Sequence, residues 1–579
     1  MTAIRTLIYL FLLLPHLVMS QSLLTPFEKS DGNKTSTYFE CIEFYKKMDQ
    51  QSNKILIREM GMSDAGYPYH LILYSNDGQF DPERWHAKHK IVMLIINGIH
   101  PGEPDGIDAT MMLIRDLNAG KIQMPDNVVL AVIPIYNIGG ALNRNRYSRV
   151  NQDGPESFGF RGNSQNLDLN RDFTKCDSRD ARSFTAIFHW LNPDIQLDNH
   201  VSDGADYQHT MTLISTQWNK LGGKTGEFLH NEFDPDLFSK MDRAGWPMCP
   251  YVNFDEGNPE KGWEAFMDFP RYSSGYAALF HTISFISETH MLKPFPDRVR
   301  STYALMNVII HSAGEKAARI REFRKFDMEQ DLSRTAVGIK WICDSSATDS
   351  IFFRGFTADY KTSHITGKPR LFYDHSRPFQ KMVPYYDHFK EEKMTEAPHA
   401  YIIPQGWHEV IELLRLNGVQ MKRLARDTLM KVLAYHILDY KSYPRPYEKH
   451  HKNYDVRVSN SEEEIQFLRG DWLIFTRQPG KRFLVEMLEP TGEDSYFAWN
   501  FFDAILQQKE GYSDYRWEDV ADSWLQQNPL VKAEWEEKKR MDSAFSNNSA
   551  AQLNFIYKHS PYYEPSHMRY PVYRLPVQH

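Results

Sequence analysis

Two side chains that can bind a metal ion directly follow a predicted buried strand. Residues 91–96 are six consecutive apolar residues, which predicts a strand buried on both faces. Asn97 and Gly98 then break the run with a turn signal, and His100 and Glu103 follow. In an open α/β sheet, sites form just beyond the carboxyl ends of the strands, so this imidazole and this carboxylate can reach one cation. Taken alone, the pair is weak evidence, because a His and a Glu at this spacing are common.

The other parts of a metal site follow two further predicted strands. A short strand over 193–197 precedes His200, and a strand over 281–286 precedes Glu288. Two imidazoles and one carboxylate, with a fourth position open, form the ligand set of catalytic rather than structural zinc. A further carboxylate can take a proton from a metal-activated water and pass it to a leaving amine. The bland alternatives are a capping or surface role for Glu288 and structural roles for the three ligands, which are His100, Glu103 and His200.

A long polar segment lies between the first and second of these strands. Residues 137–172 are rich in Arg, Asn, Gly and Gln, and loops of this length are usually functional or disordered. The arginines favour a functional loop. They are Arg144, Arg146 and Arg149, followed by Arg171 at the end of the run Asn166-Leu167-Asp168-Leu169-Asn170-Arg171.

These motifs together resemble the zinc metallocarboxypeptidase family, the carboxypeptidase A-like peptidases. The family's marks are a His-x-x-Glu, an Asp-x-Asn-Arg, a later His and a Glu near the end of the domain. Here they stand in the family's order as His100 to Glu103, Asp168 to Arg171, His200 and Glu288. The resemblance covers about residues 60–310, roughly half of the chain. Each piece is common by chance, whereas the four together are specific.

The resemblance implies a role for each matching residue. One zinc ion per chain would be bound by His100, Glu103 and His200, with Glu288 as general base and then acid. Asp168 would accept a hydrogen bond from a zinc-binding imidazole. Asn170 and Arg171 would hold the free carboxylate of the substrate's last residue. Arg149 is matched to the arginine that polarises the scissile carbonyl, with Arg146 as the alternative and a loop salt bridge as the structural explanation.

Departures from the family pattern leave the substrate open. The family's mobile Tyr has no clear counterpart, although Tyr272, Tyr276 and Arg271 lie in that neighbourhood. The leading hypothesis is hydrolysis of the C-terminal peptide bond of peptides. One alternative is a zinc amidase or deacylase that acts on cell-wall peptides or N-acyl amino acids, and another is an inactive peptide-binding protein of the same fold. Three other histidines are expected to be structural rather than ligands: His209, His281 and His290.

Composition and length bound the remaining expectations. The chain has 579 residues with net charge -8 and both signs interspersed, which argues against a general nucleic-acid binder. Residues 1–20 combine Arg5 with an apolar run and predict a cleaved secretory signal, hence an exported protein without stable membrane insertion. The four cysteines show no paired spacing, so at most one disulfide is expected, and the oligomeric state is left open.

The alternation of strand and helix patterns predicts the fold class. Helices over 107–117, 179–191 and 298–323 alternate with apolar strands, which predicts an α/β domain over 21–330 with a mixed, mostly parallel sheet between helices. The irregular segment 220–270 is expected to form walls of the substrate site. Residues 331–579 are expected to form accessory α/β or β-rich domains, with strands that include 472–476 and 483–487.

Overall fold

A mixed eight-stranded sheet forms the centre of the first half of the chain. The computed structural model describes residues 23–253 and 257–576, so the predicted signal peptide over 1–20 lies outside the described residues. The order across the sheet is β1-β2-β4-β3-β5-β9-β6-β7. The strands are β1 (Ile55–Met62), β2 (Pro68–Tyr74), β3 (Ile91–Asn97), β4 (Val128–Ile133), β5 (Ile195–Ser202), β6 (Met211–Ser215), β7 (Cys249–Pro250) and β9 (Ile283–His290).

The parallel part of this sheet is its interior. β3 pairs in parallel with β4 and β5, and β5 pairs in parallel with β9, while β1, β2 and β6 run antiparallel to their inner neighbours. All residues of β3, β4 and β5 are buried, as expected for strands covered by helices on both faces. The mixed, mostly parallel sheet of the predicted α/β fold is therefore present.

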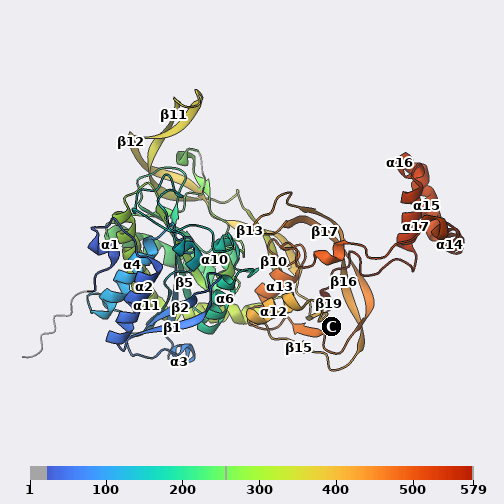
Figure 1. The fold of residues 1–579 in the computed structure, drawn as a ribbon, viewed down its shortest axis with the longest axis horizontal. Helices are drawn as coiled ribbons and strands as arrows, with labels where there is room; N and C mark the ends of the chain where they lie inside the picture. The colour runs from blue at the N-terminus through green and yellow to red at the C-terminus, as the bar shows by residue number, and fades with distance from the viewer. Residues whose placement is uncertain (1–22, 254–256, 577–579) are drawn as a thin grey trace, which may run out of the picture.

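Helices cover both faces of the sheet. α4 and α11 pack against each other and against β3, while α6 contacts β1 and α10 contacts β5 and β9 from the other side (Figure 1). The helices and single turns of this half are α1 (Pro26–Lys29), α2 (Tyr38–Gln51), α3 (Pro82–Ala87), α4 (Asp105–Asn118), α5 (Ile138–Leu142), η1 (Leu169–Arg171), α6 (Arg179–Leu191), α7 (Trp218–Leu221), α8 (Gly223–Phe228), η2 (Leu229–Phe233), α9 (Asp234–Arg243), η3 (Pro259–Lys261), α10 (Ser273–Ala278) and α11 (Phe295–Ser333).

Several boundaries differ from the sequence expectation. β5 continues through His200 to Ser202, because β9 supplies parallel partners for its last three residues, beyond the point where pairing with β3 ends at Asn199. The loop 137–172 contains the short helix α5 and the turn η1. The segment 220–270 is not wholly irregular, because α8, η2 and α9 lie within it. Residues 483–487 belong to the buried helix α13 (Lys481–Leu488) rather than to a strand.

The second half of the chain forms three further sheets. β10 (Ala336–Cys343) pairs with β13 (Phe389–Glu396), and β11 (Asp349–Thr362) forms a long hairpin with β12 (Pro369–Tyr386). A six-stranded sheet has the order β15-β18-β14-β19-β16-β17. Its strands are β14 (Ala400–Ile403), β15 (Lys422–Arg423), β16 (Thr428–Ser442), β17 (Asn453–Phe467), β18 (Trp472–Phe475) and β19 (Tyr573–Leu575), with α12 (His408–Leu416), α13 and the turn η4 (Asp503–Leu506) beside them.

The two halves of the chain share one continuous apolar core. Phe280 stacks on Phe483 with ring centroids 5.4 Å apart, and Tyr276 donates a hydrogen bond to Asn417. The β11–β12 hairpin returns to the first half of the chain, where the end of β12 pairs with β8 (Trp263–Glu264). The proposed division at residue 330 therefore separates stretches of sequence that pack together in space.

A helical group extends from the C-terminal sheet. It contains α14 (Asp514–Gln527), α15 (Pro529–Met541), α16 (Ser543–Ser546) and α17 (Ser549–His559), which lie at the far end of the molecule from the central sheet (Figure 1). These helices bury a small core of their own around Trp517 and Tyr557. The chain then returns to the six-stranded sheet through β19.

The described part of the chain has neither a membrane-spanning helix nor a disulfide. No helix within 23–253 or 257–576 is long and apolar enough to cross a membrane. All four cysteines are free thiols: Cys41, Cys176, Cys249 and Cys343. The fold is therefore held without a disulfide.

A buried carboxyl on α4 makes the stability of the fold depend on pH. Asp108 accepts hydrogen bonds from Ser36 N at 3.1 Å and Ser36 Oγ at 3.0 Å, yet burial raises its pKa from 3.8 to about 7. Because the folded state holds the proton more tightly than the unfolded state, the stabilising effect is complete below pH 3.8 and is lost as the pH rises toward 7.

Asp108→Asn is expected to remove this dependence. The stability of the variant relative to the natural protein should increase by about 2–3 kcal/mol between pH 5 and pH 8, since the amide stays neutral. Chemical unfolding at both pH values measures the difference, and the exposed Asp519→Asn serves as control. Parallel stability profiles for Asp108→Asn and the natural protein would contradict the expectation.

Candidate active site

Two neighbouring parallel strands place the three predicted metal ligands together. β3 ends at Asn97, and Gly98 turns the chain with a φ of +64° before His100 and Glu103. In the sheet, Asn97 lies opposite Asn199 of β5, so His200 is the next residue beyond that pair. The side chains of all three ligands are 3% exposed.

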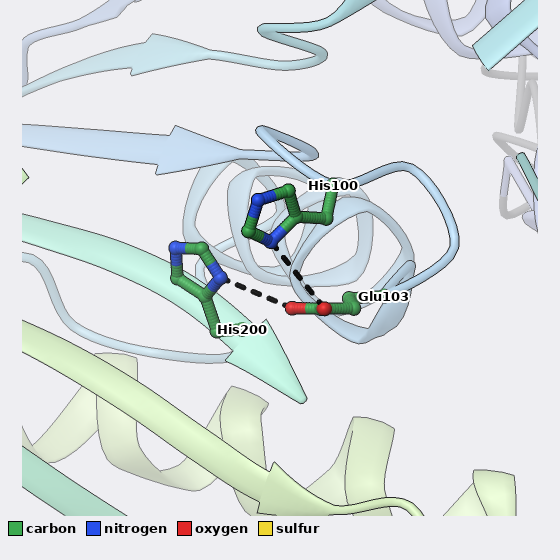
Figure 2. Close-up of side chains that lie close together, drawn as sticks. All are labelled: His100, Glu103 and His200. Carbon is green, nitrogen blue, oxygen red and sulfur yellow. Dashed lines mark hydrogen bonds and ion pairs between the residues drawn. The ribbon is translucent and has the colours of Figure 1, made fainter. Parts of the chain in front are cut away.

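Both imidazoles turn one nitrogen toward the Glu103 carboxylate. His100 Nδ1 lies 3.3 Å from Glu103 Oε1, and His200 Nδ1 lies 3.0 Å from Glu103 Oε2 (Figure 2). Ligand atoms on a tetrahedral zinc with bonds of about 2.0–2.1 Å lie about 3.3–3.4 Å apart. The ligand atoms are therefore close enough to meet at one ion.

The other nitrogen of each ring faces a carboxylate. His100 Nε2 lies 2.8 Å from Asp168 Oδ1, the contact that the family resemblance implied, and His200 Nε2 lies 3.0 Å from Asp198 Oδ2. His100 Nδ1 is buried and has no hydrogen-bond partner among the described residues. A ring held by a carboxylate on one side, with an unpartnered nitrogen on the other, is the arrangement of a metal-binding histidine. The residues present thus fit a bound cation.

Asp198 was not predicted as a functional residue. It is fully buried, and it also accepts a hydrogen bond from Ser273 Oγ at 2.7 Å. The available signal was its position two residues before His200, because alternate residues of a strand point to the same face. That signal depends on His200 lying within β5, and the expected strand ended at residue 197.

Asp198→Asn is expected to weaken zinc binding at this site by about 10–100-fold, because the imidazole loses the carboxylate that orients it. Zinc titration of the metal-free protein by calorimetry measures the change. Asp331→Asn is a matched control, because Asp331 forms a buried pair with His281 at 2.9 Å elsewhere in the fold. An unchanged zinc affinity in Asp198→Asn would show that Asp198 does not support the ligand.

The charges of the ligand cluster shift one another's pKa values. Burial raises the pKa of Glu103, but Arg149 and the two imidazoles outweigh burial and hold it well below its ordinary range. Burial lowers the pKa of His200, but Asp198 and Glu103 raise it well above its ordinary value. Burial raises the pKa of Asp168, but His100 and the neighbouring arginine side chains lower it further, so the pKa lies below its ordinary value. Glu103 and Asp168 are therefore held as carboxylates, the form that binds a cation or accepts from an imidazole.

Glu288 lies opposite His200 on the adjacent strand β9. The two residues are register partners in the parallel pair β5–β9. Burial and the Glu103 and Asp198 carboxylates raise the pKa of Glu288 to about 8, against the opposing effect of His200. Such a carboxyl can hold and release a proton near neutral pH, and a bound cation would lower its pKa again.

The arginines of the long loop have different positions from those expected. Arg149 donates to Glu103 Oε1 at 2.7 Å, to Val201 O at 2.9 Å and to Gln152 Oε1 at 2.7 Å, which engages three of its N–H groups. Arg146 stacks on the exposed Tyr147. Arg149, which was matched to the carbonyl-polarising residue, is therefore directed at Glu103 and is absent from the residues that line the pocket.

Arg161, which sequence reasoning passed over, lines the catalytic pocket. Its Nε donates to Asp168 Oδ2 at 2.9 Å, and its Nη1 lies 3.5 Å from Glu103 Oε1. Burial lowers its pKa, but Asp168, Glu103 and Glu288 together raise it. The side chain is 46% exposed, so it is accessible to a ligand in the cleft. The sequence signal was its place seven residues before Asp168 in the same loop.

Asn170 and Arg171 both face the same pocket. Asp168 caps the turn η1 by accepting from Asn170 N at 2.9 Å, which fixes the following two side chains. Asn170 Oδ1 is buried without a hydrogen-bond partner among the described residues. The Arg171 guanidinium lies over the Tyr272 ring, 4.7 Å from its centroid. An amide and a guanidinium side by side can bind a carboxylate.

The pocket that these residues enclose has a volume of about 160 Å³. Its lining joins the ligands, Glu288 and Arg161 to an aromatic wall: His100, Glu103, Arg161, Asn170, Arg171, His200, Val201, Ser202, Asp203, Ile214, Tyr251, Phe266, Tyr272, Ile286 and Glu288. Tyr251 and Phe266 come from the segment expected to supply the walls. The pocket thus brings together the candidate metal ligands, the Glu288 carboxyl, and the amide and guanidinium of Asn170 and Arg171.

The other side chains considered from the sequence lie elsewhere. Tyr276 is fully buried, and Arg271 pairs with Asp494 at 2.9 Å. Three histidines contact protein groups rather than the candidate ligands: His209 with Pro247 O, His281 with Asp331 and His290 with Ala205 O. Among the tyrosines near the expected position, Tyr272 is the one that lines the pocket.

The C-terminal half also contacts the functional loop. Glu448, in the turn between β16 and β17, accepts a hydrogen bond from Asp168 N at 2.8 Å. The neighbouring His450 lies 2.8 Å from Asp177 Oδ2. These contacts brace the loop that carries Asp168, Asn170 and Arg171, so the second half of the chain supports the site.

Comparisons with known proteins point in the same direction. No protein-family model matches the chain. Carboxypeptidase 2 of Trichophyton rubrum is 20% identical, and the alignment covers 81% of this chain and 85% of that relative. Carboxypeptidase 2 of Trichophyton equinum is 21% identical over the same shares.

Solved structures overlap with part of the chain. A carboxypeptidase A from Helicoverpa armigera has 15% identity and a TM-score of 0.36, and the overlap covers 49% of this chain and 74% of that chain. A metallo-carboxypeptidase from Burkholderia cenocepacia has 15% identity and a TM-score of 0.36, covering 48% and 70%. The sequence relatives, which extend over four fifths of the chain, confirm its predicted resemblance to the carboxypeptidase A-like metallocarboxypeptidases.

Proposed function

We propose that the protein is an exported zinc carboxypeptidase that hydrolyses the C-terminal peptide bond of peptides. The observation that carries the proposal is the convergence of His100, Glu103 and His200 from two strand ends, with Glu288 opposite His200 in the same pocket. Two imidazoles and one carboxylate are a catalytic zinc set with an open position. The likeness to named carboxypeptidases supports the reaction type.

The chain's own residues supply proton transfer and charge stabilisation. A zinc ion held by the three ligands would polarise the scissile carbonyl and make an attacking water more acidic. Glu288 accepts the proton of that water and then donates it to the leaving amine. Asp168 and Asp198 keep the two ligand imidazoles oriented.

We assign stabilisation of the developing oxyanion to Arg161 rather than Arg149. Arg161 lines the pocket with a side chain that is 46% exposed, while Arg149 lies outside the lining and is bonded to Glu103, Val201 O and Gln152. Arg149 then has a supporting role, because its hydrogen bond to Glu103 holds the carboxylate of that candidate ligand in position. Donors of the Arg161 kind contribute about 3–4 kcal/mol in comparable sites.

Asn170 and Arg171 are proposed to hold the substrate's terminal carboxylate, which makes the enzyme an exopeptidase. Both side chains line the pocket, and Tyr272 packs over the guanidinium. The proposed processing is removal of residues 1–20, with a catalytic region over 21–330 and an accessory region over 331–579. The accessory region supports the catalytic loop through Glu448.

Arg171→Ala tests the carboxylate site. We expect kcat/KM for peptides with a free C-terminus to fall by about 10–100-fold, mostly through KM, since a charge-assisted contact worth about 1.5–3 kcal/mol is lost. Rates on C-terminally amidated peptides should change little. Arg146→Ala, which removes an exposed arginine of the same loop, is the control.

A substrate panel separates the proposed reaction from the alternative hydrolase. Free peptides, muropeptides and N-acyl amino acids are assayed with and without a chelator. Zinc-dependent release of the last residue from free peptides is the expected result. Zinc-dependent turnover of muropeptides or N-acyl amino acids alone would replace the proposal with the amidase or deacylase, and zinc binding without turnover would indicate the binding protein.

A further inference from the structure

We infer that the protein binds a second divalent transition-metal ion, held by His230, Asp349 and His388 at the base of the β11–β12 hairpin. The three residues come from distant parts of the chain. His230 lies in the π-helical turn η2, Asp349 is the first residue of β11, and His388 is the second residue after β12. Single π-helical turns are rare in proteins, and those that occur are frequently found at functional sites.

The candidate ligand atoms surround one point. His230 Nε2 lies 3.4 Å from Asp349 Oδ2, and His388 Nε2 lies 3.7 Å from Asp349 Oδ1. Each of the three residues offers one ligand atom, and these atoms all lie within 4.8 Å of one another. Two imidazoles with one carboxylate are a donor set that suits zinc and its neighbours rather than magnesium or calcium.

These spacings favour an ion over a cluster of direct hydrogen bonds. N–H···O bonds are usually 2.7–3.2 Å long, and both His–Asp349 distances are longer. The separations instead approach the value of about 3.3–3.4 Å expected between ligand atoms on a tetrahedral zinc. At the first site, His100 Nδ1 and Glu103 Oε1 show the corresponding distance of 3.3 Å.

Surrounding groups orient the two rings. Trp218 stacks on His230 with centroids 4.5 Å apart and meets His388 edge-on at 5.3 Å. Asp387 Oδ2 lies 3.6 Å from His230 Nδ1, the nitrogen directed away from Asp349. Asp387 Oδ1 is buried, has no hydrogen-bond partner among the described residues and lies 3.7 Å from His388 Nε2. Asp387 therefore lies behind the His230 ring, as Asp168 lies behind the His100 ring, and it also faces the nitrogen of His388 that is directed at Asp349.

The second site would fasten the hairpin beside the catalytic cleft. His230, Asp349 and Asp387 line a cavity of about 720 Å³. Three residues belong to the lining of both this cavity and the catalytic pocket: Ile214, Tyr251 and Phe266. An ion there links η2, which belongs to the catalytic half, to both ends of the hairpin. The role assigned to the ion is to hold the wall of this cavity in place.

Metal stoichiometry of the full-length protein tests the inference. The protein is stripped with a chelator, reloaded with Zn²⁺ and analysed for bound metal by mass spectrometry and calorimetry. We expect two zinc ions per chain in the natural protein and one in His388→Ala. His364→Ala is the matched control, because His364 is exposed in the turn of the same hairpin, and it should keep both ions.

Two further variants keep the test decisive if His388→Ala fails to fold. Asp349→Asn changes a side chain that is 44% exposed and should lose the second ion. Asp387→Asn should weaken its binding by about 10–100-fold. A natural protein that binds one zinc, or an Asp349→Asn variant that binds two, would overturn the inference. His100→Ala should lose the ion of the first site and keep the ion of the second site. A failure of this inference can therefore be distinguished from a failure of the proposed function.

Discussion

Replacing Glu288 with glutamine is expected to lower kcat by about 10³-fold while the catalytic site keeps its zinc. The glutamine has nearly the same size, but it cannot accept a proton from the attacking water, and general acid–base groups contribute about 10²–10⁴-fold. Glu288 is not one of the three residues whose atoms meet at the metal site, so the ligand set stays intact. Steady-state kinetics and metal analysis of the same preparation measure both quantities.

A second buried glutamate provides the control for this variant. Glu486 on α13 is buried, and burial raises its pKa, but it lies outside the catalytic pocket lining. Glu486→Gln removes a comparable carboxyl without touching the site, and its kcat should stay close to that of the natural protein. If the Glu288→Gln enzyme turned over at the natural rate, the general-base role of Glu288 would be refuted, and no residue would be assigned as the proton acceptor.

Replacing His100 with alanine is expected to remove the catalytic ion and to lower kcat/KM by at least about 10³-fold. Two ligand side chains remain, and the several kcal/mol that a bound ion contributes to carbonyl polarisation are lost. Asp168 also loses the imidazole that faces it at 2.8 Å. Metal content falls by one ion per chain relative to the natural protein, and the peptide assay falls with it.

His189 offers a matched control for the loss of a buried imidazole. It lies on α6, 3.0 Å from Tyr276 Oη, and is not a candidate ligand. His189→Ala is expected to keep the catalytic zinc and its activity, even if the loss of packing lowers the unfolding temperature. If His100→Ala kept its full metal content and activity, the assignment of His100 as one of three zinc ligands would be wrong.

The contribution of the second half of the chain follows from its contacts. Arg271 pairs with Glu493 and Asp494, and Glu448 binds the backbone of Asp168. These contacts, together with the shared apolar core, make the accessory region part of the structure that holds the catalytic loop. The base of its β11–β12 hairpin pairs with β8 of the first half, although the hairpin follows that half in the sequence.

The local pattern of the sequence was sufficient to select the three side chains that the structure brings together as candidate ligands. The apolar run of β3 followed by a glycine turn places His100 and Glu103 at a strand end, and the apolar residues before His200 and Glu288 do the same. These signals are local because burial and side-chain alternation act over a few residues. The mixed sheet could be predicted for the same reason.

Only the tertiary structure decided which neighbours complete the site. The choice between Arg149 and Arg161 depends on how the long loop folds over the ligands, and no spacing in that loop determines it. The pairing of Asp198 with His200 could be recognised only in the structure, where backbone pairing with β9 extends β5 through His200.

The sequence by itself therefore determined the candidate ligands His100, Glu103 and His200 and the strands that carry them. The order of those strands and the second His–Asp cluster were decided by tertiary packing. His230, Asp349 and His388 meet because a hairpin from the second half of the chain returns to the first. Contacts between residues so far apart depend on how the elements pack, and packing leaves no periodic signal in the sequence.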